Sequence, residues 1–359
     1  MTKVLAFYLP QFHPIPENDK WYGKGFTEWT NVAKARPLFK GHVQPHIPSE
    51  LGFYDLRNVD VMRKQAEMAK KYGVDGFCFW HYWFGNGKRL LETPFKLLVE
   101  NKDIDISFSL AWANETWEKK LWDKSKNNQI IAKQEYPGIK DYEEHFYALL
   151  DAFKDPRYTR IDDKLFFVIY RPLDFPDVKE MLTLWRELAK KENIDDFYFV
   201  AKDFDCRNKE EILNMGFDGI YNDTLLNIHH YLSVPQKIKL KIQRDYFGMP
   251  TIFKYRDAIK YMVTKDDYDE NIIPLVAPNW DHSPRSGKKS IILTDAKPKY
   301  FEKVFDDAYK SINRKKEKNK IILIRAWNEW GEGNYLEPDV EYGDGYLKAI
   351  SNVRSKYEK

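Results

Sequence analysis

The chain has few cysteines, no long apolar run and little net charge, and each of these features excludes a class of protein. The two cysteines in 359 residues, Cys78 and Cys206, are too few and too far apart to form a disulfide framework. No stretch approaches the roughly 20 apolar residues of a membrane span, and the N-terminus has only a short apolar run ending at a proline. The 58 basic and 55 acidic residues leave a net charge of +3, without an electrostatic footprint for nucleic acid or an anionic membrane. We therefore expect a cytoplasmic protein with no membrane span and no nucleic-acid partner.

The pattern along the chain is a repeated alternation of short apolar runs with longer segments of helical periodicity. Eight runs have the composition of β-strands, namely residues 3–9, 74–80, 106–112, 164–170, 197–202, 217–222, 272–278 and 321–327. Strands alternating with helices favour a parallel sheet, and eight such units predict a (β/α)₈ barrel, a TIM barrel, forming one domain over residues 1–359. The alternative is a doubly wound α/β sheet, but neither a G-x-G-x-x-G turn nor a P-loop is present.

The expected strand ends carry polar and aromatic residues. Active sites of (β/α)₈ barrels lie at the C-terminal ends of the strands, so these side chains are predicted to meet. Aromatic rings stack on the C–H faces of sugars and planar polar groups bind their hydroxyls, so the composition, with 16% aromatic residues, predicts a carbohydrate cleft. The predicted substrate-binding residues are Tyr8, Gln11, His13, Trp80, His81, Tyr82, Trp112, Asn114, Glu115, Tyr170, Tyr221, Asn279, Trp280, Asp281, Arg285, Trp327, Trp330 and Glu337.

The last strand is followed by "AWNEWGEGNYLEPD", in which Glu329 and Glu332 are the predicted catalytic pair. Cleaving a glycosidic bond needs a proton for the leaving oxygen and stabilisation of an oxocarbenium-like carbon, and two carboxyl groups of different pKa supply both. Glu332 lies between two glycines in a loop and is predicted to be the general acid, with Glu329 as its partner. A pair of acids three residues apart is also typical of a helix N-terminus, but here it follows a strand.

Several motifs together resemble the WbsX-like proteins, which are often labelled glycosyltransferases of polysaccharide gene clusters. They include "AFYLPQFHPIPEND", "GFTEWTNV", "GFCFWHYWF", "LAWANETW", "PNWDHSPR" and the acidic segment at the C-terminal end. These proteins are similar to the family 99 glycoside hydrolases, (β/α)₈ enzymes that act on α-mannosides. The similarity to the hydrolases rests mainly on E-W-x-E-G followed by E-P, and this chain has Gly331 where they usually carry a histidine.

The resemblance implies a retaining, endo-acting glycosidase for α-linked sugars of mannan-like or bacterial surface polysaccharides. It also implies a route in which Glu329 deprotonates the sugar 2-hydroxyl, which then displaces the leaving group. Direct attack by the carboxylate is the alternative open from the residues themselves.

Two other functions are consistent with parts of the sequence. A glycosyltransferase would use a D-x-D metal motif, and Asp203 and Asp205 match those letters. A non-catalytic carbohydrate-binding protein would use the same aromatic residues without the paired acids. His13, Asp281 and His282 lack the H-x-H or H-E-x-x-H spacing of a metal site, so neither metal nor other cofactor is predicted.

Overall fold

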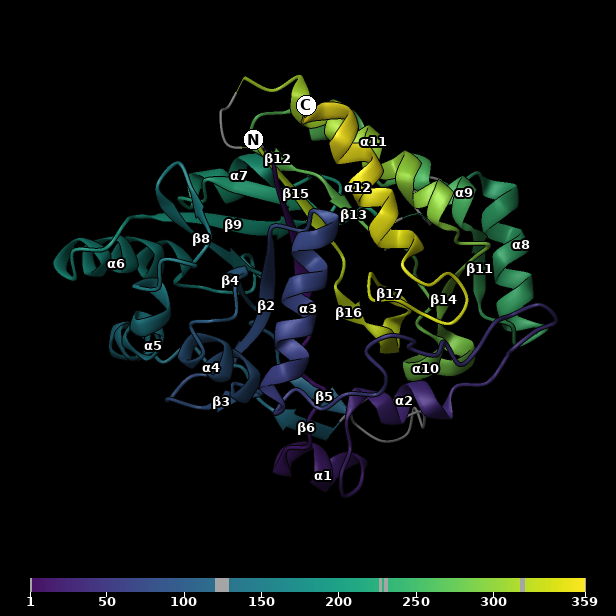
Figure 1. The fold of residues 1–359 in the computed structure, drawn as a ribbon, viewed down its shortest axis with the longest axis horizontal. Coiled ribbons are helices and arrows are strands. Elements are labelled where there is room, and N and C mark those ends of the chain that lie inside the picture. Colours follow the sequence, from purple (N-terminus) through teal and green to yellow (C-terminus); the bar gives the residue numbers. More distant parts are fainter. Residues whose placement is uncertain (1, 120–128, 226–227, 229–231, 317–319, 359) are drawn as a thin grey trace.

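The computed structural model describes residues 2–119, 129–225, 228, 232–316 and 320–358. Its centre is a parallel sheet whose strands follow one another around a barrel, with helices outside (Figure 1). In chain order the barrel strands are β1 (Lys3–Tyr8), β2 (Gly76–Trp83), β4 (Ser107–Trp112), β8 (Lys164–Ile169), β9 (Phe197–Asp203), β10 (Gly219–Asn222), β12 (Ile272–Ile273), β13 (Leu275–Val276) and β15 (Ile321–Ile324). All eight runs predicted from the sequence supply barrel strands, and the predicted (β/α)₈ fold class is confirmed.

The seventh run is divided at Pro274, and this is where the sheet closes. β12 pairs with β10 on one side, whereas β13 pairs with β15 on the other. Proline has no N–H to donate to a ladder, so a strand is interrupted there. The Pro274 carbonyl still accepts a hydrogen bond from the Leu323 backbone N–H at 3.0 Å, and the two short strands together complete the ring.

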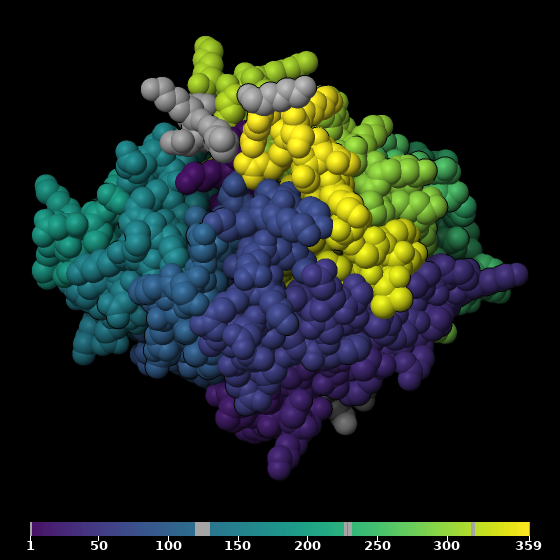
Figure 2. All heavy atoms as spheres, in the orientation of Figure 1, coloured from purple at the N-terminus to yellow at the C-terminus, as the bar shows by residue number. Residues whose placement is uncertain are grey.

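Helices cover the outside of the barrel (Figure 1), and the C-terminal segment, yellow in Figure 2, lies against the dark blue segment around residues 59–72. The outer helices are α3 (Val59–Tyr72), α4 (Thr93–Glu100), α5 (Ile139–Phe153), α6 (Val178–Lys191), α7 (Lys209–Asn214), α8 (Val234–Asp245), α9 (Tyr255–Ala258), α11 (Pro298–Asn313) and α12 (Gly345–Tyr357). α3 shows how the sequence sets their bounds. Its cap Asn58 accepts a hydrogen bond from the Asp60 N–H, and it ends at Gly73, whose φ of 88° favours glycine. Among the described residues, none of these helices is long and apolar enough to cross a membrane.

The remaining elements lie in the loops. They are α1 (Pro16–Tyr22), α2 (Glu28–Lys34), α10 (Ser283–Ser286), the 3₁₀ turns Ile259–Tyr261, Lys265–Tyr268, Gly287–Lys289 and Trp330–Glu332, and the short strands β3 (Arg89–Leu90), β5 (Trp117–Lys119), β6 (Gln129–Ala132), β7 (Arg160–Ile161), β11 (Thr251–Lys254), β14 (Ile291–Thr294), β16 (Asn328–Glu329) and β17 (Asn334–Tyr335). The loop after β1 contributes α1 and α2, and the loop after β13 contributes α10. These segments position the site.

Side chains alternate strictly between the barrel interior and the helical layer, because successive residues of a strand point to opposite faces. On β1, Leu5 and Phe7 belong to the interior cluster, whereas Tyr8 packs with the helix-facing core. On β2, Cys78 and Trp80 face inward, while Phe79 faces the helices. This alternation determines which strand-end residues can reach the cleft.

One buried hydrogen-bond network ties the loop after β15 to α3. The Glu337 carboxylate accepts hydrogen bonds from Tyr54 Oη at 2.9 Å, Gln65 Nε2 at 2.6 Å and Trp330 Nε1 at 2.6 Å. Gln65 in turn accepts one from Tyr8 Oη at 2.7 Å. Tyr8, Trp330 and Glu337, predicted to bind substrate, therefore lie in the core instead.

We expect Glu337→Ala to destabilise the fold by about 3 kcal/mol or more, because it leaves three buried donors without an acceptor. Urea unfolding should show the loss as a lower midpoint, with exposed Glu187→Ala as the matched control. A loss below about 1 kcal/mol, the ordinary cost of a substitution, would contradict this role of the network.

Candidate active site

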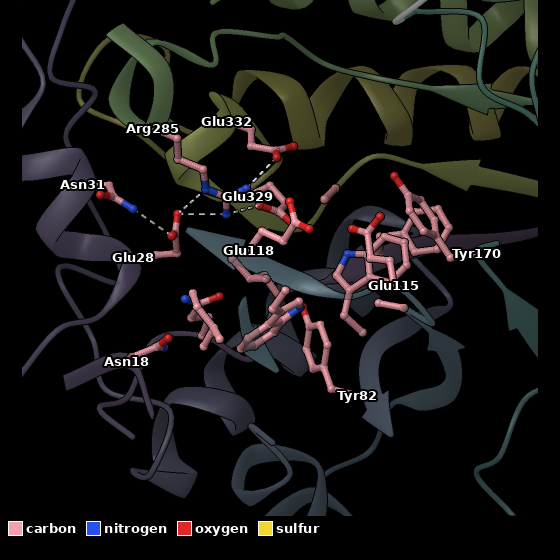
Figure 3. A pocket seen from close by; sticks show the side chains of 18 of the residues that line it. Asn18, Glu28, Asn31, Tyr82, Glu115, Glu118, Tyr170, Arg285, Glu329 and Glu332 are labelled. Atoms are coloured by element: carbon pink, nitrogen blue, oxygen red, sulfur yellow. Dashed lines mark hydrogen bonds and ion pairs between the residues drawn. The ribbon is translucent and has the colours of Figure 1, made fainter. Parts of the chain in front are cut away.

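A cleft of about 570 Å³ opens at the C-terminal ends of the barrel strands (Figure 3). Its floor includes Phe7 and Trp80 from strands β1 and β2, whose rings stack at 4.8 Å. Its walls include Tyr82 and Tyr170, and Tyr170 meets Trp80 edge to face at 5.4 Å. The cleft therefore has aromatic surfaces at its base and carboxylates along one side, a combination suited to a sugar ring.

The guanidinium of Arg285 stands between three carboxylates in this cleft (Figure 3). Its Nη1 lies 2.5 Å from Glu332 Oε1, its Nη2 lies 2.9 Å from Glu329 Oε2, and its Nε lies 2.9 Å from Glu28 Oε2. The four residues come from α2, α10 and the turn after β15, three segments far apart in the sequence. One guanidinium thus joins three carboxyl groups at the end of the barrel.

Glu28 occupies the space beside Gly331. A methyl group added at Gly331 would lie 1.9 Å from Glu28 Oε2 and 3.0 Å from Arg285 Nε. No positive φ is recorded for Gly331, so space alone, and not backbone conformation, requires glycine there. Asn31 Nδ2 holds the other Glu28 oxygen at 3.0 Å, which leaves the carboxylate little freedom to move aside.

The two predicted catalytic acids have different electrostatic surroundings. Burial raises the pKa of Glu329 to about 8, and the neighbouring charges of Glu332 and Glu28 add to the rise while Arg285 opposes it. Burial also acts to raise the pKa of Glu332, but the charges of Arg285, His282 and Arg325 outweigh it and leave that pKa below its usual value. In the ligand-free site Glu329 therefore holds a proton at neutral pH and Glu332 is ionised.

A second cationic group borders the cleft. Arg325 follows β15, and its guanidinium binds the buried Asp223 carboxylate through two hydrogen bonds of 3.2 and 2.7 Å. Lys202 Nζ lies 3.4 Å from the same carboxylate and 3.8 Å from the centre of the Tyr170 ring. Burial lowers the pKa of Lys202 to about 8. The cleft is thus flanked by two charged clusters, one with three carboxyl groups around a single arginine and one with two basic groups around a single carboxylate.

Eight of the residues predicted to form the site line this cleft: Gln11, Trp80, Tyr82, Glu115, Tyr170, Arg285, Glu329 and Glu332. Glu115 also pairs with Arg171, whose Nη2 lies 3.1 Å from Glu115 Oε2. The structure brings these eight side chains together from widely separated segments.

Strand alternation turns two predicted residues, His81 and Trp112, away from the cleft, in addition to Tyr8. His81 and Trp112 face the helices. His81 Nε2 lies 2.8 Å from His145 Nε2 on α5, and Trp112 Nε1 donates to the Trp83 carbonyl at 2.9 Å. Trp327 also belongs to the helix-facing core, but alternation does not explain this, because Arg325 and Ala326 beyond the end of β15 both line the cleft. Tyr221 faces inward but is buried beneath the cleft, 5.5 Å from the Phe7 ring. We therefore no longer expect these residues to contact a substrate.

The other predicted loop residues have partners outside the cleft. His13 Nδ1 contacts the Pro10 carbonyl, and Asn114 is buried against the backbone of Arg171. Trp280 lies in the core, where its ring meets the Arg325 guanidinium.

Asn279 and Asp281 border a separate hollow near His42. Asp281 Oδ2 is bound by His42 Nε2 at 2.7 Å and by Gln44 Nε2 at 2.6 Å, so its side chain points away from the two glutamates. Its backbone N–H nevertheless donates to the Glu332 carbonyl at 2.8 Å, so Asp281 supports the catalytic turn without a role in the cleft.

Several lining residues were missed by the sequence analysis: Asn18, Tyr22, Glu28, Asn31, Glu118 and Arg325. Most of them lie in loops beyond the strand ends on which the prediction relied. Arg325 follows the last strand two residues after Leu323, an inward-facing residue, so alternation would have found it. Among the described residues no group of three or more histidine, cysteine or acidic side chains is arranged to hold a metal ion.

The fold matches solved structures along most of the chain. A structure described as a glycoside hydrolase-like protein matches with a TM-score of 0.65 and 16% identity, covering 98% of this chain and 93% of its own. The GH99 endo-alpha-mannosidase of Bacteroides thetaiotaomicron matches with a TM-score of 0.59 and 17% identity, covering 98% and 96%. The chain therefore shares the (β/α)₈ barrel fold of these structures.

The sequence comparison is more specific. The family model described as Glycosyltransferase WbsX matches residues 4–350, and the chain belongs to this family. WxcX proteins of two strains of Xanthomonas campestris pv. campestris, B100 and ATCC 33913, are 36% and 35% identical to it. The matches cover 98% of this chain and 50% of each relative, so the chain spans about half the length of these relatives.

We expect Gly331→Ala to destabilise the protein by about 1–3 kcal/mol, because the added methyl overlaps the Glu28 carboxylate. The double variant Glu28→Ala/Gly331→Ala should recover at least ~1 kcal/mol relative to the sum of the single effects. Urea midpoints of the four proteins of this cycle measure the coupling. Additive effects would show that Glu28 does not limit the space at Gly331.

Proposed function

We propose that the protein is a retaining glycosidase that cleaves α-linked sugars of mannan-like or bacterial surface polysaccharides. The observation that carries the proposal is a pair of glutamates with opposite pKa shifts, joined by one guanidinium at the end of a barrel whose floor is aromatic. Such a pair supplies both a proton and a negative charge, the two requirements of glycoside cleavage. The likeness in fold to GH99 endo-alpha-mannosidase is consistent with this chemistry and with endo action.

The sugar ring would lie over the Trp80 and Tyr170 rings, with its anomeric carbon beside the two glutamates. We assign proton donation to Glu332 because its side chain is 20% exposed against 9% for Glu329, so an oxygen leaving toward solvent reaches it first. In the ligand-free site the proton resides on Glu329. Substrate binding must therefore transfer it to Glu332, so that the pair enters the reaction with one proton, which Glu332 gives to the leaving oxygen.

The ionised partner would then act in one of two ways. It attacks the anomeric carbon directly and forms a glycosyl-enzyme, or it deprotonates the 2-hydroxyl so that this oxygen displaces the leaving group as a 1,2-anhydro sugar. A substrate lacking the 2-hydroxyl separates these routes. It remains cleavable by direct attack and resists the second route.

The family description favours a second candidate, a glycosyltransferase. The D-x-D letters at Asp203 do not support it, since both Asp203 oxygens are used locally. Oδ1 accepts from the Phe204 N–H and Asn208 Nδ2, and Oδ2 accepts from the Asn208 N–H. The Asp205 carboxylate pairs with Arg207. A transferase built on this chain would therefore have to use the same barrel-end cleft.

The proposal is tested by incubating the purified protein with mannans and bacterial surface polysaccharides and identifying products by mass spectrometry. Shortened glycans that appear with the wild type, but not with Glu329→Gln/Glu332→Gln, would support hydrolysis. Transfer from a nucleotide sugar to an acceptor, without hydrolysis of any glycan, would favour the second candidate.

Leaving-group dependence tests the division of roles. Glu332→Gln should slow cleavage most for poor leaving groups, because an activated aryl group needs little proton assistance. Glu329→Gln should be nearly inactive with every leaving group. Each substitution should raise the activation free energy by several kcal/mol, far more than the ~0–1 kcal/mol that a surface ion pair contributes. Rates are measured on an activated and a natural glycoside, with Glu187→Gln as the surface control. The opposite pattern would make Glu329 the donor.

The pH dependence of kcat/KM follows from the one proton that Glu329 and Glu332 share before the reaction. Activity should fall as pH rises through about 8, where the raised pKa of Glu329 releases the proton, and should fall again in acid as Glu332 is protonated. Glu28→Gln removes a negative charge that raises the pKa of Glu329, so the alkaline limb should move to lower pH. If Glu28→Gln loses activity at the same alkaline pH as the wild type, the pKa of Glu329 does not set the alkaline limb.

A further inference from the structure

Helix α8 (Val234–Asp245) lies at the outer edge of the molecule beside β11 (Figure 1). Its apolar residues face away from the protein. Val234, Ile238 and Ile242 are each more than half exposed, as are Tyr246 and Phe247 directly after the helix. No residue of α8 is buried. A globular surface helix ordinarily turns such a stripe toward the core.

The exposed residues form one continuous stripe. Val234, Ile238, Ile242 and Tyr246 follow one another at intervals of four, which places them along one side of a helix of 3.6 residues per turn. The half-buried Leu240 lies on the opposite side. The stripe is about 18 Å long, at 1.5 Å per residue over the helix. It is therefore an ordered apolar surface and not a scatter of single residues.

Basic residues accompany this stripe. Residues 234–260 contain seven lysines and arginines against two acids, an excess larger than the net charge of +3 of the whole chain. Lys239 and Lys241 are both exposed. Lys239 directly follows Ile238 and Lys241 directly precedes Ile242, so the turn of about 100° between successive residues of a helix places one lysine along each edge of the stripe. The balanced overall charge thus conceals a strongly positive segment.

We propose that α8 and the adjoining Tyr246 and Phe247 form a contact surface for an anionic lipid bilayer. The helix lies in the plane of the membrane, its apolar stripe enters the boundary between headgroups and acyl chains, and Lys239 and Lys241 bind anionic headgroups at its edges. Tyr246 places an apolar ring with a polar tip at the level of the headgroups. The surface does not depend on the chemistry of the cleft, so it stands apart from the proposed glycosidase activity.

Charge complementarity favours an anionic membrane over a second copy of this chain. Lysines on both edges of an outward apolar stripe allow their long side chains to reach headgroups on either side of an inserted helix. A second copy of this surface would bring the same positive charges together, which opposes pairing of like faces.

Vesicle co-sedimentation of the full chain tests the proposal. The vesicles consist of phosphatidylcholine alone or of phosphatidylcholine with about one third phosphatidylglycerol. Wild-type protein should sediment with the anionic vesicles and less with the neutral ones. Ile238→Ser/Ile242→Ser and Lys239→Glu/Lys241→Glu should each weaken binding about tenfold or more. Leu173→Ser/Val340→Ser and Lys179→Glu/Lys190→Glu, exposed residues elsewhere, are matched controls and should bind as wild type.

Circular dichroism and unfolding midpoints equal to wild type would show that the α8 variants remain folded, so a loss of binding reports on the surface alone. No sedimentation of wild type with anionic vesicles would overturn the proposal, as would equal binding by the α8 variants and the controls. Self-association in size-exclusion chromatography that Ile238→Ser/Ile242→Ser abolishes, without vesicle binding, would identify a second copy as the occupant instead.

Discussion

The contact of Arg285 with three carboxylates is the interaction on which the rest of the site depends. It joins the loop after β1, the loop after β13 and the turn after β15, so three independent segments are positioned by one guanidinium. A buried group of like charges is stable only when a counter-charge with good geometry is present. Arg285 supplies that charge. Arg285 lowers the pKa of both Glu329 and Glu332, and the two remain unequal because their other neighbours differ.

Sequence reasoning predicted the barrel well because periodicity reports burial directly. Eight apolar runs in order leave few topologies, and even the interruption at Pro274 falls inside one of them. The site was predicted less completely. The predicted residues include successive positions near the strand ends, such as Trp80, His81 and Tyr82, whereas only alternate residues of a strand face the cleft. Taking every second residue from Phe7 and Trp80 would have removed Tyr8 and His81, and the same rule from Leu323 would have included Arg325.

Other features could not be read from the sequence because they depend on long-range packing. Glu28 follows β1 by some twenty residues, and nothing in its neighbourhood predicts that α2 folds back to Gly331. The Glu337 network likewise requires a knowledge of how α3 lies against the last loop. The excess positive charge around α8 was present in the sequence, but averaging over 359 residues concealed it.

The close approach of Glu28 to Gly331 constrains how this family can diverge. A lineage that acquires any side chain at position 331 must first, or at the same time, shorten or remove the one at position 28. The two positions should therefore change together among relatives, with glycine at 331 wherever an acid occupies 28.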